Sequence, residues 1–310
     1  MRPFCGTPRI PPAVSRKFSD KRRGFWEKAL GDGLGLPMGD RSCLPPDDAS
    51  ETLHVRLIPP MNNTRPIAML AALTLPLIST GAEEPRNDPR WVRTEGQLQF
   101  KDRFEREETD PQREDLGPGW TTSSAERAKG NKQVALSGGF LQITRHPVAD
   151  HAVSVRHPLE FANGAIEARI RLGAGDDFTM NFADMELPTV HAGHLSLTRW
   201  TLKDVTMTDA KTGIFDLALR ERRLKGEKSP ELEALLAAKT RTFPCALTPG
   251  QWHTVLVVFE GDEMRVSLDG KAVGAHRSIG FAHPTKRLIR FLVSKSAELD
   301  DVRIWKLPAR

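Results

Sequence analysis

Residues 251–270, QWHTVLVVFEGDEMRVSLDG, carry the clearest pattern of hydrophobic and polar positions in the chain. The mostly apolar run from Trp252 to Glu260 suits a half-buried strand, and Gly261-Asp262 follows it as turn chemistry. From Met264 to Leu268 apolar and polar residues alternate, which is the period of a strand with one wet face. Asp269-Gly270 then supplies a second turn signal. The pattern predicts an antiparallel β-meander.

Similar runs recur along most of the chain after residue 97. They are short, rich in Val, Ile, Leu and Phe, and separated by Gly, Asp and Pro; examples are Leu98–Phe104, Ala165–Leu172 and Val302–Trp305. Many short strands with this punctuation favour an all-β sandwich or jelly roll over alternating βα units. We expect the first and last of these strands to lie close together.

One segment breaks the β pattern. Ser229 has the character of a helix cap and Pro230 that of a first-turn proline, and leucines at 232, 235 and 236 continue a helical stripe. The sequence therefore predicts one short helix at about 230–239, at the periphery of the sandwich. Ile214–Leu219 is predicted to be a strand, and Arg220–Lys228 a solvated arm.

The meander also carries a resemblance to a known superfamily. Residues 250–274 look like the late hairpin of concanavalin A-like (laminin-G/glucanase-type) jelly-roll domains. Further matching pieces follow in order, namely 100–104 with Gly119-Trp120, 137–143, 164–172 and 300–305. Their order resembles the bacterial 3-keto-disaccharide hydrolase-type branch. The resemblance covers Leu98 to Leu307, and it implies a sandwich of two antiparallel sheets acting on a glycoside or an oxidised sugar.

The start of the chain contains a segment that resembles an export signal. Met61–Arg65 brings one positive charge, Ile67–Ile78 is a 12-residue apolar run, and Thr80-Gly81-Ala82 supplies small residues before Glu83. The apolar run is short for a membrane span, and a buried strand or helix is its alternative. We therefore expect an exported protein, periplasmic or extracellular, without a membrane span in its mature form. The predicted partition is a non-domain extension with a mis-assigned start at 1–60, a signal peptide at 61–82, a lead-in at 83–97 and the sandwich domain at 98–307.

Charge and cysteine content narrow the function classes. The formal net charge is +5, but most of the basic excess lies before residue 83, so the predicted domain is close to neutral. There is no basic stripe and no Tyr for base stacking, so no nucleic-acid partner is predicted. Cys245 is the one cysteine of the predicted mature part, and a single cysteine forms no intramolecular disulfide.

The carboxylate pattern of laminarinase-type glycosidases is absent. Those enzymes carry E-x-D-x-x-E or a near variant on one strand, which places two carboxylates on one face. The nearest counterpart is Asp184-Met185-Glu186, which is followed by Pro188 and is one carboxylate short. A retaining glucanase mechanism is therefore not expected.

Two sets of residues are candidates for binding a substrate. Glu167, Arg169 and Arg171 share one face of their strand, because strand side chains alternate. They form either a solvated face with Glu–Arg pairs or a polar concave floor that grips sugar hydroxyls or a carboxylate. Trp200, beside Arg199, is a candidate surface platform for sugar stacking, whereas tryptophans within apolar runs are expected in the core.

Histidines are the most suggestive polar group. Asp150-His151, His191-Ala192-Gly193-His194 and His283 fall between predicted strands, and Lys211 lies in another loop. Loops at strand ends are where sites are usually built. We expect the first three of these histidines and Asp150 to line one polar pocket as catalytic residues, with Lys211 and His283 beside it to bind substrate.

The spacing of His191 and His194 makes this pocket a demanding prediction. Residues three apart on a straight strand point to opposite faces, so the two imidazoles converge only if Gly193 bends the chain. Converging imidazoles can shuttle protons, or they can hold a divalent metal with a carboxylate. In the plainer alternative, each histidine satisfies a local backbone group.

Two function classes stay open at this stage. The first is an exported carbohydrate-active enzyme, as the resemblance implies. The second is a non-catalytic glycan-binding or adhesion module on the same fold, because a fold by itself does not fix a function. Titratable groups converging in a cleft favour the enzyme, and an exposed aromatic residue without them favours the binding module.

Overall fold

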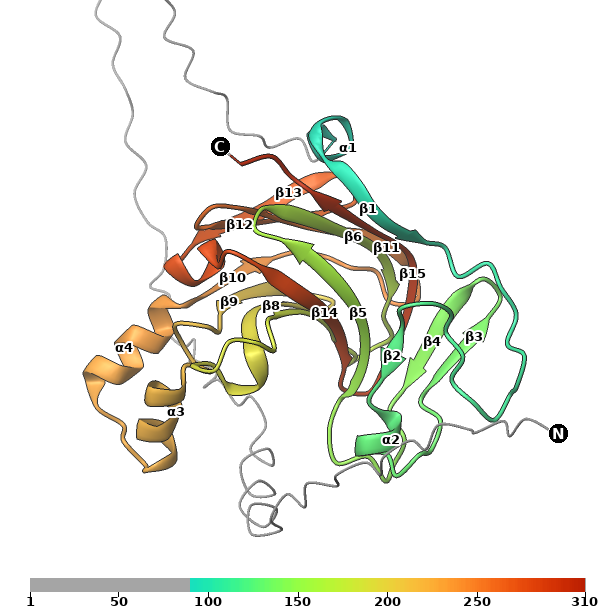
Figure 1. Ribbon diagram of the computed structural model, residues 1–310, viewed down its shortest axis with the longest axis horizontal. Coiled ribbons are helices and arrows are strands. Elements are labelled where there is room, and N and C mark those ends of the chain that lie inside the picture. The colour runs from blue at the N-terminus through green and yellow to red at the C-terminus, as the bar shows by residue number, and fades with distance from the viewer. Residues whose placement is uncertain (1–89, 310) are drawn as a thin grey trace, which may run out of the picture. The chain divides into compact units, whose positions relative to one another are not determined.

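The computed structural model describes residues 90–309, which form two antiparallel β-sheets around a common core (Figure 1). This is the jelly-roll sandwich that the sequence predicts. The proposed extension, the signal peptide and most of the lead-in lie outside the described residues. Among residues 90–309, no helix is both long and apolar enough to cross a membrane.

Sheet A has the strand order β13-β12-β11-β6-β15-β4-β3, and β1 pairs with β15 beside this path. The predicted meander is β11–β12–β13, and the first strand does lie against the last, with Gln97 opposite Lys306. The strands are β1 Gln97–Asp102, β3 Val134–Ser137, β4 Phe140–Thr144, β6 Gly164–Arg171, β11 Trp252–Glu260, β12 Glu263–Leu268, β13 Lys271–Arg277 and β15 Ser296–Lys306.

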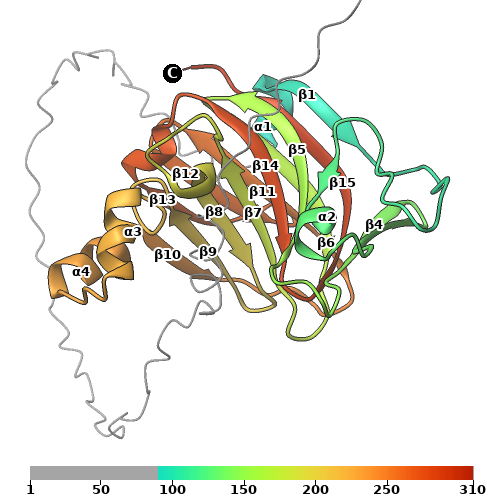
Figure 2. The same cartoon turned by 60° about the horizontal axis from the view of Figure 1, so that its bottom comes forward.

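Sheet B has the strand order β10-β9-β8-β7-β14-β5-β2. Its outer side faces the viewer in Figure 2, with α3 and α4 at one edge and α2 at the other. The strands are β2 Thr121–Thr122, β5 Val153–Phe161, β7 Phe178–Ala183, β8 His194–Trp200, β9 Asp204–Asp209, β10 Thr240–Pro244 and β14 Lys286–Val293.

The core lies between the two sheets and follows the alternation of strand side chains. Sheet A sends in Ile166 and Val257, and sheet B sends in Phe178, Phe182 and Phe291, all of them fully buried. The residues between these core positions point outward and form the outer faces of the sheets. Burial of Val257 was expected; Trp252, also expected in the core, is instead only half-buried.

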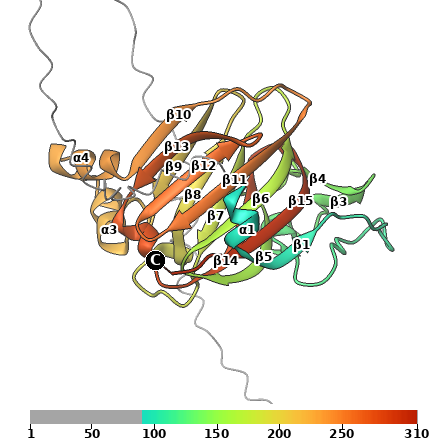
Figure 3. The ribbon, with the colours of Figure 1, turned by 90° about the horizontal axis from the view of Figure 1, so that it is seen from above.

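The helices are short and peripheral. They are α1 Trp91–Glu95, α2 Ser124–Arg127, α3 Leu217–Leu224 and α4 Pro230–Ala238, with 3₁₀ turns η2 His191–Gly193 and η3 Ile279–Ala282. Figure 3 shows α1 on the outer side of sheet A. The predicted helix is α4, in which Ser229 Oγ accepts a hydrogen bond from the Leu232 amide as the cap.

Helix α3 corrects one prediction. Ile214–Leu219 was expected to be a strand, yet a helix begins at Leu217 and continues through most of the predicted solvated arm. The Asp216 side chain accepts a hydrogen bond from the Leu219 amide, which caps the helix, and Leu-Ala-Leu-Arg-Glu-Arg-Arg-Leu is a run of good helix formers. The segment's local helix propensity therefore outweighs the short apolar alternation seen in its sequence.

Candidate functional site

The candidate residues on β6 lie on the outer face of sheet A, and each is engaged in an ion pair. Glu167 accepts hydrogen bonds from Arg93 and Arg303, at 2.8 Å and 2.7 Å. Arg169 pairs with Asp300 at 3.1 Å, Arg171 pairs with Glu298, and both guanidiniums lie over the Trp252 ring. Of the two alternatives for this face, the structure has the one with Glu–Arg pairs, and it does not bring these residues near the histidines on sheet B.

Trp200 is a correction. It was a candidate surface platform, but it is 0% exposed and belongs to the core. In β8, Arg199 points outward and pairs with Asp177, so the next side chain must point inward. Trp200 therefore cannot contact a ligand at the surface.

The outer face of sheet B carries a compact polar cluster on three neighbouring strands, made by Asn181 on β7, His194 on β8 and Arg290 on β14. His194 Nδ1 lies 2.9 Å from Asn181 Oδ1, and Arg290 Nη1 donates to the same oxygen at 3.3 Å. Asn181 is fully buried, Arg290 is 9% exposed and His194 is partly exposed. We call these three residues the His194 cluster.

The hydrogen bonds of the His194 cluster fix its protonation. Asn181 Oδ1 accepts from Arg290, and Asn181 Nδ2 donates to the Ser196 carbonyl at 3.3 Å, which together set the orientation of the amide. His194 Nδ1 lies 2.9 Å from Asn181 Oδ1 and 3.4 Å from Arg290 Nη1, and the shorter contact favours Nδ1 as the donor toward Asn181. The neutral imidazole then keeps the lone pair on Nε2, the nitrogen turned away from Asn181, as a hydrogen-bond acceptor.

Charge and burial keep His194 neutral. Burial, followed by the positive charges of Arg290, His191 and His151, lowers the pKa of His194 to about 3. The pKa of His191 is also lowered, first by burial and then by Arg220 and Arg290. Cationic neighbours and burial thus act in the same direction on both imidazoles.

The chain bends at Ala192-Gly193, between the two histidines, as their convergence requires. Ala192 and Gly193 both have positive φ, 48° and 67°, and a Cβ at Gly193 would lie 2.2 Å from the Asp184 carbonyl oxygen. The rings of His191 and His194 are consequently 6.3 Å apart. Phe215 stacks on His194 with a centroid distance of 4.4 Å, and it lies 5.8 Å from His191.

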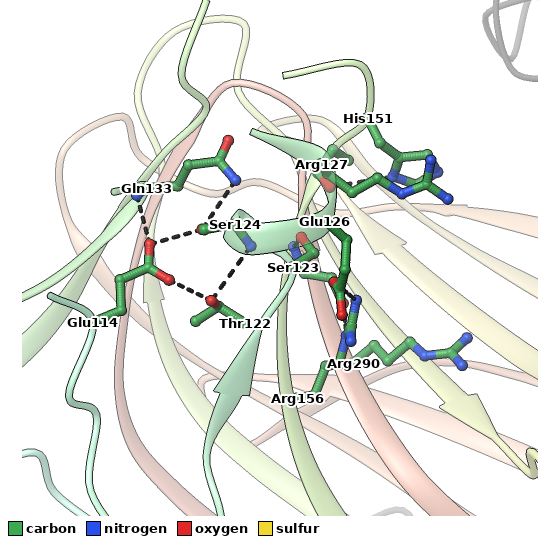
Figure 4. A network of polar contacts seen from close by, with 12 residues as sticks. Glu114, Thr122, Ser123, Ser124, Glu126, Arg127, Gln133, His151, Arg156 and Arg290 are labelled. Atoms are coloured by element: carbon green, nitrogen blue, oxygen red, sulfur yellow. Dashed lines mark hydrogen bonds and ion pairs between the residues drawn. The ribbon is translucent and has the colours of Figure 1, made fainter. Parts of the chain in front are cut away.

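His151 lies at the α2 side of this face, beside Arg127 (Figure 4). His151 is close enough to His194 to lower its pKa, and its own Nδ1 lies 3.2 Å from the Ala152 carbonyl oxygen. Asp150 is exposed and pairs with Arg127 at 3.5 Å. The three histidines therefore gather on one face, but Asp150 is directed to an arginine of α2.

A half-buried carboxylate, that of Glu114, holds α2 beside the sheet. Glu114 accepts hydrogen bonds from Ser124 Oγ at 2.7 Å and from the Gln133 amide at 2.6 Å, and it also bonds Thr122 (Figure 4). This network fixes the segment that carries Glu126, which pairs with Arg156 of β5 at 3.2 Å. Glu114 therefore has a positioning role in the fold.

His283 and Lys211 form a separate group beyond the end of β7. His283 is buried, and its Nε2 lies 3.0 Å from Asp184 Oδ2. Burial opposes ionisation of Asp184, but hydrogen bonds from His283 and the Glu186 amide, with the charge of Arg287, lower its pKa overall. Burial and then Lys211 lower the pKa of His283. His283 is therefore built into the support of this loop rather than presented to a ligand.

The arrangement of these side chains does not match a metal site. Within residues 90–309, no group of three or more His, Cys, Asp or Glu side chains is close enough to hold a metal ion. The proposed metal alternative for the histidines is therefore not supported by this geometry. The cluster offers a guanidinium, an amide and neutral imidazoles, which suit hydrogen bonding to polar ligands.

Sequence reasoning missed three members of this face. Asn181 and Arg290 are polar residues flanked on both sides by apolar ones, in the strands FTMNFA and KRLIRFLV, and that interruption was the available signal. Phe215 was overlooked because only tryptophans were considered as stacking platforms. It is partly exposed and lies in the loop between β9 and α3, where its carbonyl accepts a hydrogen bond from the His191 amide at 2.8 Å.

No family model and no curated protein matches the chain. Solved structures similar to it include the carbohydrate binding module CBM66 from Bacillus subtilis, with 12% identity, a TM-score of 0.41 and coverage of 60% of this chain and 95% of that one. An endo-beta-1,3-glucanase from Pyrococcus furiosus has 14% identity, a TM-score of 0.42 and coverage of 69% and 96%. A laminarinase from Flavobacterium sp. UMI-01 has 12% identity, a TM-score of 0.44 and coverage of 67% of this chain and 100% of that one. The two-sheet topology of the described residues confirms the predicted jelly-roll sandwich, and similarities of this size establish neither a superfamily nor an activity.

Proposed function

We propose that the protein is carbohydrate-active and that a saccharide binds on the outer face of sheet B, at the His194 cluster and Phe215. The observation that supports this proposal is the convergence of an aromatic ring with hydrogen-bonding side chains that are themselves held in place. Sites for small polar ligands combine apolar or aromatic contact with a few fixed polar groups. Asn181 and Arg290 are fixed by bonds to the backbone, so they need little ordering when a ligand arrives.

Each group has a distinct role in this proposal. The neutral Nε2 of His194 accepts a hydrogen bond from a sugar hydroxyl, and the Arg290 guanidinium donates to a sugar oxygen. The partly exposed Phe215 ring packs against the apolar C–H face of a sugar ring. Together they bind one saccharide unit from two sides.

The test is saccharide binding by the full chain and by His194→Ala. We expect calorimetry on an oligosaccharide identified in a glycan array to show affinity at least about tenfold weaker for the variant, because one hydrogen bond to the sugar is lost and Phe215 loses the imidazole on which it stacks. The melting temperature should stay near that of the wild type. His253→Ala is the matched control, since His253 bonds Asp269 at 2.7 Å on sheet A. Equal binding by wild type and His194→Ala would place His194 in a structural role.

Hydrolysis of a 3-keto-disaccharide or a related oxidised glycoside is the second candidate. The observation that favours it is a neutral imidazole next to a guanidinium. A carbonyl acidifies the neighbouring C–H; His194 Nε2 can take that proton while Arg290 stabilises the negative charge on the carbonyl oxygen. The enolate then expels the glycosidic oxygen from the adjacent anomeric carbon, the leaving sugar takes up a proton as its alcohol, and water adds to the resulting enone to complete the hydrolysis. The low pKa of His194 makes it a weak base, and therefore binding is the first candidate.

A turnover assay separates these two candidates. The full chain is incubated with a 3-keto disaccharide and with its unoxidised counterpart, and products are followed by NMR. Consumption of the keto sugar by the wild type and its loss in His194→Ala would support the enzyme. Binding without turnover would support a non-catalytic glycan-binding module.

We also propose that the protein is exported, on the basis of the signal-like order in residues 61–82. Removal of this segment should leave a mature protein that begins at Glu83. N-terminal sequencing of the protein from its native host tests this directly. A mature form that retains residues 1–60 would contradict it.

A further inference from the structure

The outer face of sheet B carries more cationic groups than partners for them. Arg156 on β5 and Arg290 on β14 are opposite each other in the register of the two strands. Arg156 pairs with Glu126, and Arg199 on the same face pairs with Asp177 at 2.7 Å. By contrast, no carboxylate of residues 90–309 lies within ion-pair distance of Arg290. Its partners are all neutral.

Those neutral partners engage both terminal nitrogens of the Arg290 guanidinium. Nη1 donates to Asn181 and lies 3.4 Å from His194 Nδ1, and Nη2 donates to the Ala192 carbonyl at 3.1 Å and contacts the Met185 sulfur at 2.7 Å. A guanidinium carries five N–H donors, and none of these contacts uses Nε–H. In Figure 4 the side chains of Arg156 and Arg290 diverge, with Arg156 turned toward Glu126 and Arg290 turned away from it.

A largely buried cation without an anion is an unfavourable arrangement in a protein that binds nothing there. Removing a charge from water is unfavourable, and a nearby opposite charge normally offsets that cost. Positive charge accumulates further around the site, since His191 is close enough to Arg220 and Arg290 for both to lower its pKa. The part of the chain that the structure describes supplies no negative charge to Arg290, and a ligand can supply it.

We propose that the saccharide bound at the His194 cluster is an anionic one, with a carboxylate or a sulfate ester that pairs with Arg290. This inference rests on the function proposed above and narrows its ligand class. An oxyanion can pair with the guanidinium charge and accept from its remaining N–H, and the hydroxyls beside the acidic group can donate to His194 Nε2. A neutral glycan would leave the Arg290 charge uncompensated.

The experiment compares four probes on the full chain by calorimetry at low and at high ionic strength. They are a neutral β-glucan oligosaccharide, an oligoglucuronate and a sulfated oligosaccharide of equal length, and inorganic sulfate alone. We expect at least one acidic oligosaccharide to bind at least about tenfold more tightly than the neutral one, with an affinity that weakens as salt rises. The arm that binds better identifies the acidic group as carboxylate or sulfate.

Variants test the role of Arg290. Arg290→Gln should weaken acidic oligosaccharides at least about tenfold and leave the neutral one within about threefold, because it removes charge but keeps a donor. Arg290→Lys keeps the positive charge but replaces the planar guanidinium by an ammonium, so its affinity for acidic oligosaccharides should fall by an intermediate amount. If the Arg290 variants fail to fold, Arg156→Gln is the second readout: it removes a positive charge opposite Arg290 and leaves Glu126 unpaired, so acidic oligosaccharides should weaken more than the neutral one. Arg169→Gln on sheet A is the matched control and should bind as the wild type does.

The outcomes separate this inference from the proposed function. Equal affinity for neutral and acidic oligosaccharides would overturn the anionic ligand and leave saccharide binding standing. Binding of none of the oligosaccharides would overturn the saccharide function. Inorganic sulfate binding as tightly as the sulfated oligosaccharide would also overturn the inference, since the site would then recognise an ion and not a sugar.

Discussion

The outer faces of the two sheets have a similar alternation of polar and apolar residues, but their charged side chains differ in whether they are paired. On sheet A, Glu167, Arg169 and Arg171 each pair with an opposite charge on the same sheet or on α1. On sheet B, Arg290 is largely buried among neutral groups. Both faces appear in the sequence as polar residues alternating with apolar ones.

This difference separates a face that holds itself together from one that is prepared for a ligand. Paired charges satisfy one another and gain nothing from a further ion, whereas an uncompensated cation gains from each anion that reaches it. A polar sheet face is therefore a candidate binding site only where a charge remains without a partner once its ion pairs have been assigned. The variants below test that distinction in terms of stability.

The largest expected effect is on sheet A. Glu167→Ala should lower the free energy of unfolding by about 2–3 kcal/mol, because a mostly buried carboxylate bonded to two arginines is lost. Its side chain is 8% exposed, and Arg93 and Arg303 both donate to it. Urea denaturation followed by circular dichroism measures the change. Saccharide binding should be unaltered, and a loss of binding at wild-type stability would contradict the division between the faces.

The strands and α4 could be predicted because their signals are local. Alternation over Met264–Leu268 and the cap at Ser229 depend only on neighbouring residues. The same alternation places Trp200 on the opposite face from Arg199, so its burial was available from the sequence and was overlooked. For α3, the Asp216 cap was the missed local signal.

The charge pairing could not be predicted because its partners are distant in the chain. Glu167 is 74 residues from Arg93 and 136 from Arg303, and only the sheet register brings the three together. The gathering of His191 and His194 was predictable as a condition on Gly193, since glycine permits the bend. The position of the Phe215 ring beside His194 and the lack of a carboxylate partner for Arg290 could be recognised only in the assembled sheet.

A smaller effect is expected on sheet B when the pH falls. The native pKa of His194 is about 3 and its ordinary value is 6.5, so between these pH values the unfolded chain binds a proton that the native protein does not. Native stability therefore falls as the pH decreases through this window, and this contribution is fully present above it. The share of His194 between about pH 6.5 and pH 5 is about 1–2 kcal/mol, with allowance for its partial exposure.

His194→Gln isolates that share from those of the other histidines with lowered pKa values. Urea unfolding of both proteins is measured across the same pH range, and the variant should lose less stability on acidification than the wild type. Parallel pH profiles would show that His194 takes up its proton in the native state as readily as in the unfolded one. That result would also remove the argument that Nε2 is a neutral acceptor at the pH of binding.

The smallest expected effect is on the unpaired cation itself. Arg290→Met should change the free energy of unfolding by less than about 1 kcal/mol, because the cost of burying an uncompensated charge is removed together with its hydrogen bonds. Asn181 Oδ1 keeps its bond from His194, and the carbonyl of the exposed Ala192 can bond water. Arg303→Met on sheet A is the matched comparison and should cost about 1–2 kcal/mol, since Glu167 and Asp301 lose a partner. Urea unfolding measures both changes. Equal losses of unfolding free energy at the two positions would mean that Arg290 stabilises its sheet as Arg303 does, which would contradict its role as an uncompensated cation that pairs with an anionic ligand.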